Sequence, residues 1–177
     1  MFLFLSAFFG FLYFYYHRRL AISSAKTILW RTFKKTLPSS IGIVALIVMS
    51  RILGGTGQVM VLAMGTAKLT GKYYAALAAF IGILGAFITS SNLASNILFG
   101  GFQQTTANLL NLNEASILGA QTAGGAMGNT ISPGNVLLGT TTTGNLGREG
   151  AVLRMILPIT LSIAMGIGVL LLVANIF

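Results

Sequence analysis

Long apolar runs separated by short polar turns make up almost the whole chain. Beyond the first polar segment, these runs cover residues 39–66, 73–89, 94–112, 115–146 and 153–177. A largely uncharged apolar run of about 17 residues or more is long enough to cross a bilayer as a helix. The pattern therefore predicts an all-α integral membrane protein with about five to six membrane segments.

The first sixteen residues are apolar and aromatic, and the positive charges follow them. A secretory signal peptide has the opposite order, with its charges before the apolar run. Tyr13, Tyr15 and Tyr16 stand just before the charges, as aromatic residues do at a membrane–water interface. We interpret residues 1–38 as a partial first span followed by a basic cytoplasmic loop over 18–35.

The basic residues predict how the chain is oriented. With the 18–35 loop in the cytoplasm, eight Lys and Arg residues fall on the inner side and two on the outer side, at positions 18, 19, 26, 31, 34, 35, 148 and 154 against 68 and 72. Cytoplasmic loops carry the excess of Lys and Arg. We therefore expect a multi-pass plasma-membrane protein whose C-terminus lies outside.

Composition supports lipid as the solvent and argues against several other functions. Only 7% of the 177 residues are charged, against about a quarter in soluble domains. The net charge of +9 could attract anionic lipid headgroups. Nucleic acid is not an expected partner, because aromatic stacking positions do not interleave with the charges.

The residues that enzymes need for catalysis are scarce. The chain has no cysteine and a single histidine, His17, so neither thiolate chemistry nor a histidine metal site is expected. Glu114 has no second carboxylate nearby with which to share acid–base work. We expect no enzymatic activity, no cofactor and no metal.

Two polar stretches, 88–96 and 121–135, interrupt apolar segments near their centres. Backbone can leave the helix at membrane depth only where it lines a cavity or is buried in protein. Transporters build midplane sites from such breaks, where half-helix ends face the solute. The candidate substrate-binding residues are Ser90, Ser91, Asn92, Asn96, Thr122, Gly124, Gly125, Asn129 and Ser132.

Helix packing is the alternative explanation of these stretches. Small and polar residues also join helices in membranes, and Gly124 and Gly128 have the spacing of the small-residue contact motif. Two such stretches at corresponding places favour a site over packing alone.

Arg51 lies inside the 39–66 run and is a further candidate. An arginine within a span is costly to bury and is usually functional, and its guanidinium suits bidentate carboxylate binding. The alternative is that the glycines at 54, 55 and 57 bring it near an interface, where it can snorkel.

Several motifs resemble the lactate permease family, which includes glycolate permeases. They are FITSSNLASNILFG at 87–100 followed by Gln103, TAGG at 122–125, Gly128, ISP at 131–133, GRE at 147–149 and Arg154. Their order and spacing agree from about Ser39 to the end of the chain, which corresponds to the C-terminal third of family members.

The resemblance implies a secondary transporter of 2-hydroxy monocarboxylates such as lactate and glycolate, coupled to protons. The hydroxyl and carbonyl oxygens of the two polar stretches favour Na⁺ as the alternative coupling ion. The resemblance also implies an elevator-type fold in which a re-entrant hairpin, with its tip at 90–92, meets a broken helix at 115–146. The expected partner is an N-terminal transporter half or further copies of the chain.

On this basis we divide the chain into four parts. Residues 1–38 hold the partial span and basic loop, 39–72 a scaffold-type span, 73–147 the transport core and 148–177 the C-terminal span. Two alternatives remain: a non-transporting membrane subunit or truncated remnant, and a small oligomeric channel lined by Ser, Thr and Asn.

Overall fold

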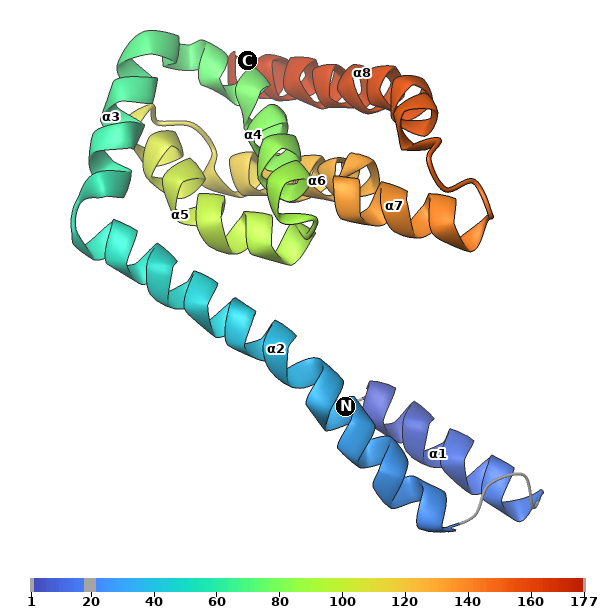
Figure 1. The fold of residues 1–177 in the computed structure, drawn as a ribbon. Helices are drawn as coiled ribbons and strands as arrows, with labels where there is room; N and C mark the ends of the chain where they lie inside the picture. Colours follow the sequence, from blue (N-terminus) through green and yellow to red (C-terminus); the bar gives the residue numbers. More distant parts are fainter. Residues whose placement is uncertain (1, 18–21, 177) are drawn as a thin grey trace. The chain divides into compact units, whose positions relative to one another are not determined.

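The computed structural model describes residues 2–17 and 22–176, and every regular element in these ranges is helical, which confirms the all-α prediction. The elements are α1 (Phe2–Tyr16), α2 (Ile22–Gly55), α3 (Gln58–Thr70), a 3-10 turn η1 (Gly71–Tyr73), α4 (Tyr74–Thr89), α5 (Asn92–Leu109), α6 (Glu114–Ile131), α7 (Pro133–Thr142) and α8 (Glu149–Ile176) (Figure 1). They form two compact units, residues 1–44 and residues 45–177, which are described separately.

Three helical segments of the described chain are long and apolar enough to cross a membrane. They cover Lys26–Gly55, Gln58–Thr89 and Glu149–Ala174. The second passes through a turn at Gly71, whose φ of 53° divides it into α3 and α4 at the predicted polar turn. Helices α5 and α6 have 18 residues each, about 27 Å, and contain more amides, hydroxyls and glycines.

The predicted loop at 18–35 is wrong from residue 22 onward, because α2 already begins at Ile22. No glycine or proline interrupts the sequence between this residue and Pro38, so nothing breaks the helix. Lys26, Arg31 and their basic neighbours are therefore helical. Residues 18–21, with two of the predicted basic residues, lie outside the described ranges.

The predicted single helix over 39–66 is also wrong. Helix α2 ends at Gly55, and α3 starts at Gln58. Gly57 between them has φ 78°, a left-handed conformation that glycine adopts at little cost. The glycines that the sequence places after Arg51 therefore end the helix.

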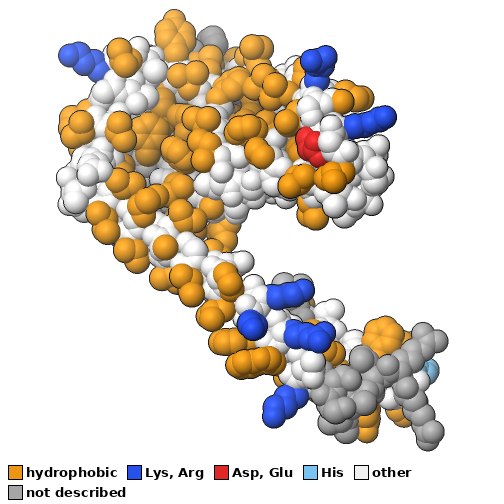
Figure 2. Space-filling view, in the orientation of Figure 1, with side chains coloured by type: hydrophobic (Ala, Val, Ile, Leu, Met, Phe, Trp, Pro, Cys, Tyr) orange, Lys and Arg blue, Asp and Glu red, His pale blue; other side chains and the backbone are white. Residues whose placement is uncertain are grey.

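Small residues make up much of the interior of the 45–177 unit, together with a few large side chains such as Tyr74, Ile117 and Ile131. Helix α4 packs against α5, α6 and α8, and α3 packs against α5 (Figure 1). The alanines of α4 at 75, 78 and 79 are fully buried, whereas large apolar side chains of the same helix, such as Leu84 and Ile88, are exposed. Figure 2 shows hydrophobic side chains over much of the visible face of this unit. Small residues inside and large apolar ones outside are typical of helices packed in lipid.

Glycines allow α4 and α6 to cross in direct backbone contact. A Cβ added at Gly124 would overlap the carbonyl oxygen of Ala79, and one at Gly128 would overlap that of Ile83. From the other side, a Cβ at Gly82 would overlap the backbone of α6. At Gly124 and Gly128 the structure therefore agrees with helix packing, the alternative explanation of this polar stretch, although Gly124 was a candidate binding residue.

Candidate functional site

A two-residue turn joins α4 to α5 at the predicted hairpin tip. Ser90 has φ 51°, and Ser91 is extended and caps α5, with its Oγ accepting a hydrogen bond from Ala94 N at 3.2 Å. Thr89 Oγ1 donates to the carbonyl oxygen of Ser91 at 3.0 Å. The hydroxyls of this sequence therefore satisfy backbone groups that the chain reversal exposes.

A single extended residue, Ser132, separates α6 from α7. Pro133 follows at the first helical position, where its missing N–H is tolerated. Asn135 Nδ2 donates to Asn129 at both its carbonyl oxygen (2.8 Å) and its Oδ1 (2.7 Å), which clamps the break. The disruption predicted over 121–135 is thus confined to one residue, and Gly124 and its neighbours lie in continuous helix.

The hairpin tip and the helix break lie against each other. A Cβ at Gly134 would lie 3.1 Å from Ser90 Oγ, and a Cβ at Gly125 would overlap Asn92 Oδ1. We call this place the junction, formed by residues 90–92 with 132–134. The structure thus brings together residues from both polar stretches of the sequence.

Four helix ends meet at the junction. Helices α5 and α7 begin there and α4 and α6 end there, so first-turn N–H groups and last-turn carbonyl oxygens without helical partners gather at this place. Of these, Ala94 N is paired with Ser91 Oγ, and the carbonyl oxygen of Asn129 accepts from Ser132 and Asn135. No side chain caps the first turn of α7 within the described residues. The helix dipoles add partial positive charge at the two starts and partial negative charge at the two ends. The junction can therefore bind an anionic group and a cation close together.

Two asparagine carbonyls on α5 lack partners. Asn92 Oδ1 and Asn96 Oδ1 are buried and, within the described ranges, accept no hydrogen bond. The residues lie four apart and so share one face of the helix. A buried acceptor without a partner costs about 1–3 kcal/mol, so these atoms are suited to a donor from a ligand.

The remaining predicted residues are placed differently. Thr122, Gly125 and Asn129 follow the i, i+3, i+7 spacing of one helix face, which is the face that contacts Asn92. Thr122 is exposed there, and its Oγ1 donates to the carbonyl oxygen of Leu118 at 3.0 Å. Arg51 is exposed on α2, and no hydrogen bond or ion pair recorded for the described residues joins it to the junction.

The sequence analysis missed a buried network that ties α4, α5 and α6 together. Tyr74 Oη donates to Gln103 Oε1 (2.5 Å), and Gln103 Nε2 donates to Gln121 Oε1 (2.8 Å). Gln121 Nε2 then donates to Ser95 Oγ (3.0 Å), which donates to the carbonyl oxygen of Gly82 (3.1 Å). All four side chains are at most 1% exposed. The signal available in the sequence was the presence of glutamine within the apolar runs 94–112 and 115–146, including Gln103 and Gln121.

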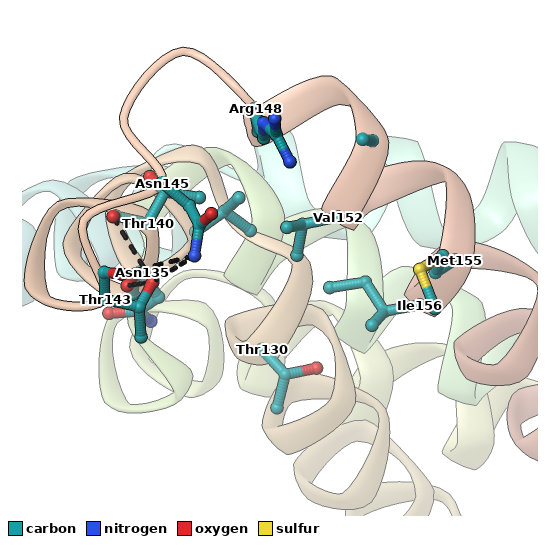
Figure 3. Close-up of a pocket in the computed structure, with 12 residues that line it drawn as sticks. Thr130, Asn135, Thr140, Thr143, Asn145, Arg148, Val152, Met155 and Ile156 are labelled. Carbon is teal, nitrogen blue, oxygen red and sulfur yellow. Dashed lines mark hydrogen bonds between the residues drawn. The ribbon is translucent and has the colours of Figure 1, made fainter.

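A second polar region lies beside the junction, between α7 and the start of α8 (Figure 3). This pocket has a volume of about 500 Å³. Thr130 and Asn135 form the wall nearest the junction, and Arg148 lies at the start of α8. The sequence analysis counts Arg148 among the basic residues of the inner side and in the GRE motif, and assigns it no binding role.

Comparison with known proteins identifies the family. Residues 4–177 match the family model described as L-lactate permease. The glycolate permease GlcA of Escherichia coli is 37% identical over 57% of this chain and 18% of its own length. The L-lactate permeases of Halalkalibacterium halodurans and Salmonella typhi are each 29% identical, over 72% and 79% of this chain and 24% and 26% of theirs.

No solved structure matches the chain. The chain spans about a fifth to a quarter of the length of the relatives it matches. The relatives named here are transporters, and the apolar helices of this chain agree with a multi-pass membrane protein. Since the family model covers nearly all of its residues, this chain belongs to the L-lactate permease family.

Proposed function

We propose that the chain forms the solute-binding part of a carrier for 2-hydroxy monocarboxylates such as lactate and glycolate. The relatives named above support this solute class. The observation that carries the proposal is the junction, where the starts of α5 and α7 meet beside unpartnered asparagine carbonyls.

The chemistry of the junction suits a 2-hydroxy acid. Its carboxylate accepts hydrogen bonds, which free N–H groups at helix starts donate. Its hydroxyl donates one, which Asn92 Oδ1 or Asn96 Oδ1 can accept. A simple carboxylic acid without the hydroxyl would leave these acceptors unpaired, so the same site discriminates against it.

We place the transport core at residues 73–147, with α4 and α5 as the re-entrant hairpin and α6 and α7 as the broken helix. Residues 39–72 form a scaffold-type span, and 1–38 and 148–177 flank the two parts. An elevator-type movement and an N-terminal transporter half, or further copies of the chain, complete the proposal. The lengths of the relatives support a larger whole.

Coupling to protons follows from the family resemblance. No titratable side chain lies among the junction residues 90–92 and 132–134, so we assign the proton-carrying group to another part of the carrier. Carbonyl oxygens at the ends of α4 and α6 would suit Na⁺ instead. Uptake driven by a sodium gradient, at zero pH difference and zero membrane potential, would contradict proton coupling.

Uptake of labelled lactate in cells expressing the complete transporter tests the site. Asn92→Ala and Asn129→Ala should each lower uptake about tenfold or more, roughly 1.4 kcal/mol per decade, while the amount of protein in the membrane stays near wild type. Asn108→Ala is the matched control, because Asn108 is exposed on the same helix as Asn92. Unchanged uptake in both variants would assign the two polar stretches to packing.

A further inference from the structure

The pocket between α7 and α8 carries a positive charge that no described group neutralises. Arg148 has no recorded ion pair or hydrogen bond from its guanidinium to a described residue. Its neighbour Glu149 is bound at the wall of the pocket, where Thr140 Oγ1 and Gly147 N donate to Glu149 Oε1 at 2.9 and 3.0 Å. Within the described residues Glu149 forms no ion pair with Arg148. The guanidinium therefore keeps its five donors for a ligand.

The other polar side chains of the pocket are already engaged. Thr130 and Thr143 donate their hydroxyl protons to helix carbonyls at 2.7 and 2.8 Å. Asn145 Nδ2 donates to Thr143 at both its carbonyl oxygen and its Oγ1. A selective site for a small polar solute needs several convergent polar groups. Here the guanidinium is the side chain with most donors unused, so the pocket is equipped to recognise an anionic group and offers few free partners for a solute's hydroxyl.

The wall below Arg148 is apolar and follows α8. Val152, Met155 and Ile156 line it, and Met155 is 74% exposed (Figure 3). Arg148 precedes the candidate membrane span Glu149–Ala174 by one residue, and basic residues at the end of a span lie near lipid headgroups. From there to Ile156 the helix rises about 12 Å into the hydrocarbon. The pocket thus presents a cation at the interface and an apolar groove beneath it.

We propose that this pocket binds one anionic phospholipid, with its phosphate on Arg148 and an acyl chain along Val152 and Met155. The charge of the arginine and the apolar wall of α8 match the two ends of such a lipid. The site is separate from the junction, although Asn135 belongs to the pocket wall and also clamps Asn129. A lipid bound in the pocket would therefore stabilise the break between α6 and α7 through Asn135.

Native mass spectrometry of the purified chain, released from detergent with added lipid, tests the proposal. Phosphatidylglycerol should remain bound more than phosphatidylcholine with the same acyl chains. Arg148→Gln should weaken phosphatidylglycerol binding about fivefold, the share of one basic residue at an anionic surface. Arg154→Gln removes an equal charge from the same helix outside the pocket and should have a smaller effect.

A second variant tests the apolar wall without changing the charge. Ala151 is exposed and lines the pocket, so Ala151→Phe should fill the groove and reduce lipid retention. Equal effects of the Arg148 and Arg154 variants would overturn the proposal and indicate general surface attraction. Arg148-dependent binding of inorganic phosphate or lactate in preference to the lipid would overturn it as well. None of these results depends on lactate uptake. The lipid proposal and the junction proposal can therefore be confirmed or contradicted separately.

Discussion

Positions 124 and 128 require glycine because the backbones of α4 and α6 leave no room for a side chain between them. At both positions the carbonyl oxygen of an α4 residue occupies the place of a Cβ. Gly119 lies on the same helix but meets nothing within 4 Å at its Cβ position. The chain therefore contains its own control for the effect of a methyl group on α6.

We predict opposite outcomes for alanine at these positions. Gly124→Ala or Gly128→Ala should destabilise the fold by about 1–3 kcal/mol, because α4 and α6 must separate. Gly119→Ala should be neutral or stabilising by up to about 1 kcal/mol, since alanine is the better helix former. Thermal unfolding of the purified variants measures the difference, and equal melting temperatures for all three would contradict the crossing described here.

Residue types could be predicted from the sequence better than their partners. The hydroxyls and amides at 90–92 and 129–132 identify both chain breaks, because few other residues serve at such turns in an apolar segment. The sequence could not show that Gly125 lies against Asn92, or that Asn135 clamps Asn129. Those contacts depend on the crossing of α4 and α6, which the local pattern does not contain.

At the level of helices, the buried glutamines decide how α5 is attached. Gln103 hydrogen-bonds to α4 through Tyr74 and the carbonyl oxygen of Ala78, and to α6 through Gln121. Its sequence neighbour Gln104 is exposed and bonds to Glu114. The two residues have the same side chain, but only Gln103 joins buried groups of three helices.

We predict that Gln103→Ala destabilises the chain and Gln104→Ala does not. Removing the Gln103 amide leaves the buried Tyr74 hydroxyl and Gln121 carbonyl without this partner, at a cost of about 1–3 kcal/mol for each unsatisfied group. The exposed change should cost less than about 0.5 kcal/mol. Melting temperature in detergent and abundance in membranes report both. A Gln103 variant as stable as wild type would show that water replaces the network.

Glycine and serine turns mark helix boundaries in this chain, whereas Pro38 and Pro158 lie inside α2 and α8 without ending them. The sequence predicts a tip at 90–92, a polar turn between 66 and 73 and a disruption within 121–135, and the structure has its turns at 90–91 and Gly71 and its break at Ser132. The basic segment at 22–35 was assigned to a loop because charge was given more weight than the lack of a breaker. The end of α2 was placed too late, because glycines inside apolar helices also serve packing, and only the left-handed φ of Gly57 distinguishes the two roles.

For the whole molecule, the basic residues of α2 should lie on the cytoplasmic side. The chain has no cysteine, so single cysteines give an unambiguous test. Lys26→Cys should resist an impermeant maleimide in intact cells, and Ala174→Cys at the other end of the chain should react. Both should react in permeabilised cells, which is the control for access. Labelling at position 26 with protection at 174 would invert the orientation.

The close crossing of α4 and α6 also limits how the protein can move. Sliding one helix along the other by one residue, about 1.5 Å, would carry larger side chains into the carbonyl oxygens that now rest on glycine. The glutamine network adds α5 to this pair. Alternate opening of the junction toward the two sides of a membrane would then need these three helices to travel as one rigid piece. In the carrier proposed above, the surfaces that slip would lie around that piece, against lipid or other segments, and the solute would be carried with it instead of threading through it.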